Sequence, residues 1–139
     1  MAQATASKII NAPADRVWDT VRTFSGLERY FTMFSSSTTE GIGVGATRTV
    51  NLPDGGKFHE RLESLDDESR TLTYAVLKSP LPIENYVGTV RVEDVGDGKS
   101  RVTWSARFDV SADQKAPMVE MLSGAYAGGI DGLEALHQT

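Results

Sequence analysis

Short stretches of alternating apolar and polar residues fill most of the first 110 positions. In the clearest stretch, residues 99–110, Val102, Trp104 and Phe108 share one parity, while arginine, threonine and aspartate occupy the other. Successive side chains of a strand point to opposite faces, so this pattern predicts a sheet with one covered and one wetted face. Turn-forming Gly, Pro and Asp residues separate seven predicted strands, at 3–11, 33–40, 46–52, 57–65, 70–78, 85–95 and 99–110.

Helical patterns occur in two places. Pro13 and Asp15 open a short helix, and residues 24–31 predict a turn followed by a second short helical piece. The longest helical pattern covers residues 112–139, with the helix itself near 115–137. At helical spacing one of its faces is apolar. That face consists of Met118, Leu122, Ala125, Gly129, Leu133 and Leu136, with Tyr126 and Ile130 on its flank.

Glycines make the middle of this long helix unusually small. They stand at Gly124, Gly128, Gly129 and Gly132, and each costs about 1 kcal/mol relative to alanine in a helix. One interpretation is close packing of the helix on the sheet. The other is that the missing side chains leave a hollow between helix and sheet. The sequence leaves both open.

The order of elements indicates the fold class. It reads strand, two short helices, six strands and a long helix, with connections of hairpin length between the later strands. Strands and helices grouped in blocks are typical of an α+β protein. We therefore expect a curved seven-stranded antiparallel sheet around the C-terminal helix, formed by a single domain of residues 1–139.

Composition excludes several classes of function. The net charge of −5 argues against a nucleic-acid partner, and the absence of cysteine excludes disulfides and thiol nucleophiles. With only two histidines, neither a metal site nor a cofactor is expected. No apolar run has the length of a signal peptide or a membrane span. We expect a cytoplasmic protein without membrane insertion, either a monomer or a homodimer.

Two predicted strands carry a charge on their covered parity. Glu60 lies between Phe58 and Leu62, and Arg48 shares the parity of Val50. Closing the intervening hairpin places Arg48 opposite Glu60 or one step away. Charges on a covered face must be paired or hydrated. Either the two residues form a polar spot inside an apolar cavity, or a β-bulge turns Glu60 outward.

With these elements in place, the chain resembles the START-like, or birch-pollen-allergen-like, helix-grip superfamily. Within it, the chain is similar to the bacterial polyketide cyclase/dehydrase-like branch and to the plant abscisic acid receptors. The resemblance covers nearly the whole chain and rests on the order and spacing of several short motifs. These are Val44 to Arg48 (VGATR), Glu60 to Leu62 (ERL), Leu65 to Asp67 (LDD) with Arg70, Asn85 with Tyr86, Val102 to Trp104 (VTW), and the glycine-rich helix.

The resemblance implies a cavity between sheet and C-terminal helix that binds an apolar or amphipathic small molecule. In the receptors, the glutamate of ERL and the tyrosine of the Asn-Tyr pair line that cavity, and they match Glu60 and Tyr86. The chain departs from the receptors elsewhere. Residues 30–33 lack the lysine that holds the hormone's carboxylate, and residues 79–83 read Ser-Pro-Leu-Pro-Ile. Hormone sensing and the receptors' phosphatase partnership are therefore not expected.

Two classes of function remain. The first is binding of a lipid-, polyketide- or isoprenoid-like molecule. The alternative is a polyketide cyclase or dehydratase, in which Glu60 is the general acid or base and Tyr86 or Arg48 steadies an enolate oxygen. The residues expected to bind the ligand are Arg48, Glu60, Tyr74, Tyr86, Trp104, Leu122, Ala125 and Gly129.

Overall fold

The computed structural model describes residues 1–137 and contains one sheet and two α-helices with a short 3-10 turn. The strands are β1 (Ala2–Ile10), β2 (Ser36–Glu40), β3 (Thr47–Asn51), β4 (Lys57–Asp66), β5 (Thr71–Lys78), β6 (Glu84–Gly96) and β7 (Lys99–Asp109). The helical elements are α1 (Ala14–Arg22), η1 (Leu27–Arg29) and α2 (Ala112–His137). Within residues 1–137, no helix combines the length and apolar character needed to cross a bilayer.

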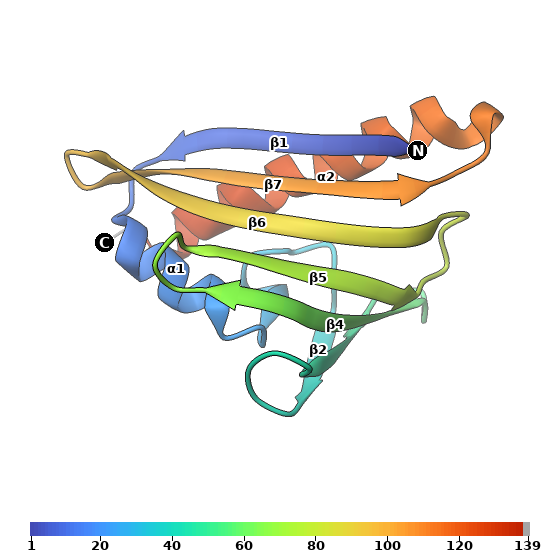
Figure 1. The fold of residues 1–139 in the computed structure, drawn as a ribbon, viewed down its shortest axis with the longest axis horizontal. Helices are drawn as coiled ribbons and strands as arrows, with labels where there is room; N and C mark the ends of the chain where they lie inside the picture. The colour runs from blue at the N-terminus through green and yellow to red at the C-terminus, as the bar shows by residue number, and fades with distance from the viewer. Residues whose placement is uncertain (138–139) are drawn as a thin grey trace.

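The seven strands form a single antiparallel sheet in the order β1-β7-β6-β5-β4-β3-β2. Hairpins join neighbours from β2 to β7, while β1 pairs with β7, so the first and last strands of the chain lie side by side. The sheet curves, and α2 lies along one of its faces with α1 at one end (Figure 1). This architecture confirms the predicted α+β helix-grip fold.

The predicted elements differ from the observed ones mainly before β2. Only one 3-10 turn, η1, forms in the segment expected to hold a second short helix. Phe24 and Gly26 both have left-handed backbone, with φ of 60° and 67°, which prevents a continuous helix there. Residues 33–35 precede the strand that was expected to include them. The last two residues of the predicted helix pattern, 138–139, lie outside the described residues.

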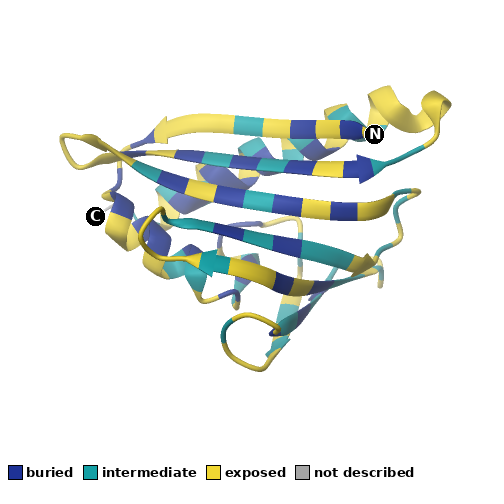
Figure 2. Ribbon diagram, viewed as in Figure 1, coloured by how far each residue is buried: buried dark blue, intermediate teal, exposed yellow. Residues whose placement is uncertain are grey.

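Burial alternates along the strands, as Figure 2 shows by the banding of each ribbon. In β7, Val102, Trp104 and Phe108 are all buried, which confirms the predicted covered face. The buried stripe of α2 runs through Leu122, Tyr126, Gly129, Ile130 and Leu133. The expectation that Tyr126 and Ile130 lie on the flank was wrong, as was the placement of Leu136, which is 39% exposed.

Candidate functional site

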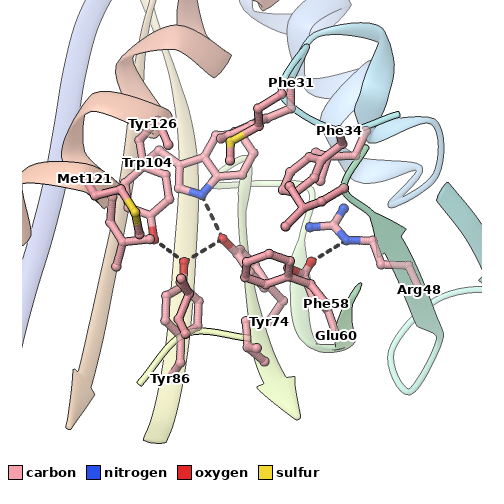
Figure 3. Close-up of a pocket in the computed structure, with 17 residues that line it drawn as sticks. Phe31, Phe34, Arg48, Phe58, Glu60, Tyr74, Tyr86, Trp104, Met121 and Tyr126 are labelled. Carbon is pink, nitrogen blue, oxygen red and sulfur yellow. Dashed lines mark hydrogen bonds and ion pairs between the residues drawn. The ribbon is translucent and has the colours of Figure 1, made fainter. Parts of the chain in front are cut away.

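A cavity of about 180 Å³ lies between the sheet and α2, and side chains from both layers point into it (Figure 3). Strands β3 to β7 form one wall, α2 the opposite wall, and the segment after α1 closes part of the rim. The lining is mostly apolar and aromatic. The residues that line it are Leu27, Phe31, Met33, Phe34, Arg48, Leu52, Phe58, Glu60, Tyr74, Val76, Leu81, Tyr86, Trp104, Met121, Leu122, Ala125 and Tyr126.

Strand register explains why residues distant in sequence meet on the sheet wall. Arg48 of β3 pairs with Glu60 of β4, Glu60 pairs with Val76 of β5, and Val76 pairs with Tyr86 of β6. Directly opposed residues on neighbouring strands point to the same face. The four therefore form a row across the sheet that lines the cavity.

Arg48 and Glu60 form the charged end of the cavity. Nε of Arg48 donates a hydrogen bond to Oε1 of Glu60 at 2.6 Å, and each residue is only 5% exposed. Irregular pairing between β4 and β5 does occur next to Glu60, after His59 and after Leu62. It leaves the Glu60 side chain facing inward, so the alternative of an outward-turned glutamate was wrong.

Further contacts hold the Arg48 guanidinium in place. Its central carbon lies 3.9 Å from the centroid of the Phe24 ring, and Nη1 donates to the Phe24 carbonyl oxygen at 3.4 Å. Burial is the largest single influence and lowers the pKa of Arg48, but the Glu60 carboxylate together with Tyr30 and Tyr74 outweighs it, and the net pKa is raised. Arg48 is therefore a charged partner of Glu60 throughout the physiological range.

Tyr74, Tyr86, Tyr126 and Trp104 form the hydroxyl end of the cavity. Nε1 of Trp104 donates to the Tyr74 hydroxyl at 2.8 Å, which lies 3.2 Å from the Tyr86 hydroxyl. The Tyr86 hydroxyl is hydrogen-bonded in turn to that of Tyr126 (Figure 3). These residues come from β5, β6, β7 and α2, so the chain of hydrogen bonds joins the sheet to the helix.

Gly88 makes room for this arrangement. It faces Tyr74 directly across the β5–β6 pair, and a Cβ atom at this position would overlap the Tyr74 ring. The ring therefore lies over the bare backbone of β6, which brings its hydroxyl within reach of Tyr86 and Trp104. A glycine in the middle of a strand is typical of such a close approach.

Burial keeps the tyrosines of the hydroxyl end neutral. Loss of solvation is the largest cause raising the pKa of Tyr74, Tyr86 and Tyr126, each to well above the ordinary value of 10. At physiological pH these side chains are therefore phenols that donate and accept hydrogen bonds. None of the buried polar side-chain atoms among residues 1–137 lacks a hydrogen-bond partner.

Seven of the eight residues expected at the site line the cavity: Arg48, Glu60, Tyr74, Tyr86, Trp104, Leu122 and Ala125. Gly129, the eighth, is not among the lining residues, because the Phe31 ring occupies the space that its side chain would take. A Cβ atom at Gly132 would likewise overlap the carbonyl group of Tyr30, whereas Gly124 and Gly128 face open space. Gly129 and Gly132 thus serve close packing, and none of the four helix glycines lines the cavity.

Sequence reasoning missed several lining residues. The most informative is Tyr126, which follows Leu122 by one helical turn and could have been assigned to the cavity from that spacing. Phe31, Phe34 and Met33 come from the irregular segment after η1, where no periodic pattern indicates direction. Among residues 1–137, no three acidic or histidine side chains gather closely enough to hold a metal ion.

The sequence of the chain matches a known family. The family model described as "Polyketide cyclase / dehydrase and lipid transport" matches residues 1–138. The chain belongs to this family. Membership supports ligand binding or cyclase chemistry in this fold without specifying a ligand.

Relatives of known name include plant hormone receptors. The abscisic acid receptor PYL7 of Arabidopsis thaliana is 32% identical over 112 residues, which cover 77% of this chain and 53% of the receptor. The abscisic acid receptor PYL2 of the same plant is also 32% identical, over 61% of this chain. The chain spans about half the length of these curated relatives.

Solved structures of other proteins share the fold. The protein XoxI of Bacillus cereus has 29% sequence identity and a TM-score of 0.88, with 99% of this chain and 96% of that protein covered. An aromatase/cyclase from a Streptomyces species has a TM-score of 0.82 over 97% of this chain and 92% of the enzyme. Its identity is only 15%, so the likeness concerns the fold alone.

Proposed function

We propose that the protein binds a hydrophobic or amphipathic small molecule, of lipid-, polyketide- or isoprenoid-like character, in the cavity between sheet and α2. The observation that carries this proposal is the cavity itself, about 180 Å³ in volume with mostly apolar walls. An apolar cavity of roughly 150 Å³ is sufficient to bind benzene in another protein. The volume therefore suits a small ring system or a comparable part of a longer molecule.

The walls divide the proposed contacts into two kinds. Leu122, Ala125 and the aromatic residues would supply apolar contact. The charged end and the hydroxyl end would orient polar atoms of the ligand. The similarity to receptors named for abscisic acid supports a binding role. The departures in residues 30–33 and 79–83 favour a ligand other than that hormone.

Native mass spectrometry of the protein purified from its own host tests the proposal directly. We expect a co-purifying small molecule whose mass identifies the ligand. The fluorescent probe N-phenyl-1-naphthylamine provides a second measurement, with binding expected for the wild type. Absence of both a co-purifying molecule and probe binding would contradict the proposed function.

A matched pair of helix variants locates the bound probe. Ala125 lines the cavity, whereas Ala135 is exposed on the same helix. The larger side chain of Ala125→Leu should occupy the cavity and weaken probe binding at least about tenfold, the equivalent of roughly 1.4 kcal/mol. Ala135→Leu should leave binding unchanged. Equal binding by both variants would place the probe elsewhere.

A second candidate function is that of a polyketide cyclase or dehydratase. The observation in its favour is the position of Glu60, a carboxylate on the cavity wall with one oxygen bonded to Arg48. Glu60 would transfer a proton while Tyr86 or Arg48 stabilised an enolate oxygen. Glu60→Gln should then retain ligand affinity and stop turnover. If the protein only binds its ligand, the same change shifts affinity or selectivity and the wild type shows no turnover.

A further inference from the structure

The hydroxyl end holds one more hydrogen than its internal bonds use. Three tyrosine hydroxyls contribute three hydrogens, and two bonds join them, Tyr74 to Tyr86 and Tyr86 to Tyr126. The remaining internal bond takes its hydrogen from the Trp104 indole. Whatever the direction of the hydroxyl bonds, among residues 1–137 one hydroxyl hydrogen of this group is left for another acceptor.

The indole indicates where that hydrogen lies. An indole nitrogen only donates, so the Tyr74 oxygen must be the acceptor of the Trp104 bond. Accepting a hydrogen bond polarises the O–H group and strengthens the bond it donates. The chain with the most cooperative direction therefore runs from Trp104 through Tyr74 and Tyr86 to Tyr126. Its free hydrogen is on Tyr126, which lines the cavity from α2.

We propose that the ligand carries a neutral carbonyl oxygen on a cyclic apolar skeleton and that the Tyr126 hydroxyl donates a hydrogen bond to this oxygen. This inference rests on the proposed binding function and specifies the chemical class of the ligand. A ketone oxygen accepts a hydrogen bond without bringing a hydrogen of its own, so it complements the single free donor. Tyr126 acts here as a binding residue on the helix wall.

The rest of the lining favours a neutral ketone over a carboxylate. A carboxylate would enter beside the Glu60 carboxylate, whose only close basic partner among the described residues is already paired with it. A neutral ketone brings no charge to this part of the cavity and needs only a hydrogen-bond donor, which the hydroxyl end supplies.

Two probes of nearly equal shape, 1-indanone and indane, isolate the carbonyl oxygen. Isothermal titration calorimetry should show that the wild type prefers the ketone to the hydrocarbon. In Tyr126→Phe this preference should fall about 3- to 10-fold, the usual value of one neutral hydrogen bond. The hydrogen then freed on Tyr86 lies one hydroxyl farther from the ketone, so it does not restore the contact.

The chain offers a matched control and an intermediate variant. Tyr30 is the fourth tyrosine, equally buried but not among the lining residues. Tyr30→Phe should keep the full preference for 1-indanone. Tyr86→Phe leaves the Tyr126 hydroxyl in place but removes the hydrogen bond that polarises it. The preference of this variant for 1-indanone over indane should therefore lie between those of the wild type and Tyr126→Phe. Circular dichroism should show all three variants folded.

Infrared spectroscopy adds a readout that stability does not affect. The carbonyl stretch of bound 1-indanone should be at lower wavenumber in the wild type than in Tyr126→Phe, because a hydrogen bond weakens the C=O bond. Equal binding of ketone and hydrocarbon, or a stretch unchanged by Tyr126→Phe, would overturn this inference and leave the binding function standing. Failure of the wild type to bind either probe would contradict the proposed function and the inference with it.

Discussion

The two polar ends of the cavity are constructed differently. The charged end consists of two residues on adjacent strands, directly opposed and joined by one short ion pair. The hydroxyl end consists of four neutral residues from three strands and a helix, joined by a chain of hydrogen bonds. Both occupy an otherwise apolar interior, yet one depends on local strand pairing and the other on the whole tertiary structure.

This difference determines how each end should fail. Removing one member of a buried ion pair leaves an uncompensated charge, which costs far more than the pair itself contributes. Removing one hydroxyl from a neutral chain leaves a polar group that can rotate or find another partner, which costs less. A single substitution at the charged end should therefore lower the stability of the protein strongly. A single substitution at the hydroxyl end should chiefly change the ligand preference.

The largest effect is expected from Arg48→Met. This change leaves the 5%-exposed Glu60 carboxylate without its partner, and should reduce the free energy of unfolding by about 3–5 kcal/mol. Urea denaturation followed by tryptophan fluorescence measures it.

The double variant Arg48→Met, Glu60→Leu is the control. It removes both charges from the same site and should be more stable than Arg48→Met alone, because no charge is left unpaired. If the single and double variants are equally stable, the charged end contributes no buried ion pair in solution. The contrast between the two ends would then be wrong.

A smaller effect is expected from Gly88→Ala, which acts on the hydroxyl end alone. The added methyl group would overlap the Tyr74 ring and displace its hydroxyl from Tyr86 and Trp104. Overpacking of this kind typically costs about 1–3 kcal/mol. Chemical denaturation measures the loss, and the ketone preference should fall with it.

Gly128→Ala provides the comparison for that variant. Its new methyl group faces open space on α2 and removes a helix glycine, so it should stabilise the protein by up to about 1 kcal/mol. Equal stability of the two alanine variants would contradict the close approach of Tyr74 to the backbone of β6.

Ionisation of the tyrosines at the hydroxyl end should lower the free energy of unfolding at alkaline pH. It should have no effect near neutral pH. Burial, the leading cause, raises the pKa of Tyr74, Tyr86 and Tyr126 above the ordinary value of 10. A raised folded-state pKa gives stability that is complete below pH 10, where both states are protonated. It declines above pH 10, because the unfolded chain then loses protons that the folded chain keeps.

Urea denaturation at intervals from pH 8 to pH 11 checks this dependence. The midpoint should be flat with respect to tyrosine ionisation below pH 10 and should decrease above it, with a shallower decrease in Tyr126→Phe. Absorbance at 295 nm reports phenolate directly. All four tyrosines are buried, so phenolate that forms near pH 10 while the fold remains intact would refute the prediction.

The sequence by itself determined the sheet and most of its cavity wall. Side chains alternate between the two faces of a strand with a period of two residues. Once one face is known to be covered, the pattern therefore indicates which residues point inward. Arg48, Tyr74, Tyr86 and Trp104 could be assigned to one face for this reason, whereas a bulge that turns Glu60 outward remained an alternative. Closing one hairpin placed Arg48 opposite Glu60 or one step away, and the structure pairs the two directly.

Only the tertiary structure decided how the helix and the irregular segment meet that wall. A helix glycine is compatible with either a hollow or a close contact, and the position of Phe31 over Gly129 decided for contact. The role of Tyr126 likewise depends on the rotation of α2 against the sheet. Local periodicity specifies which residues of one element share a face, but packing between elements decides what that face touches.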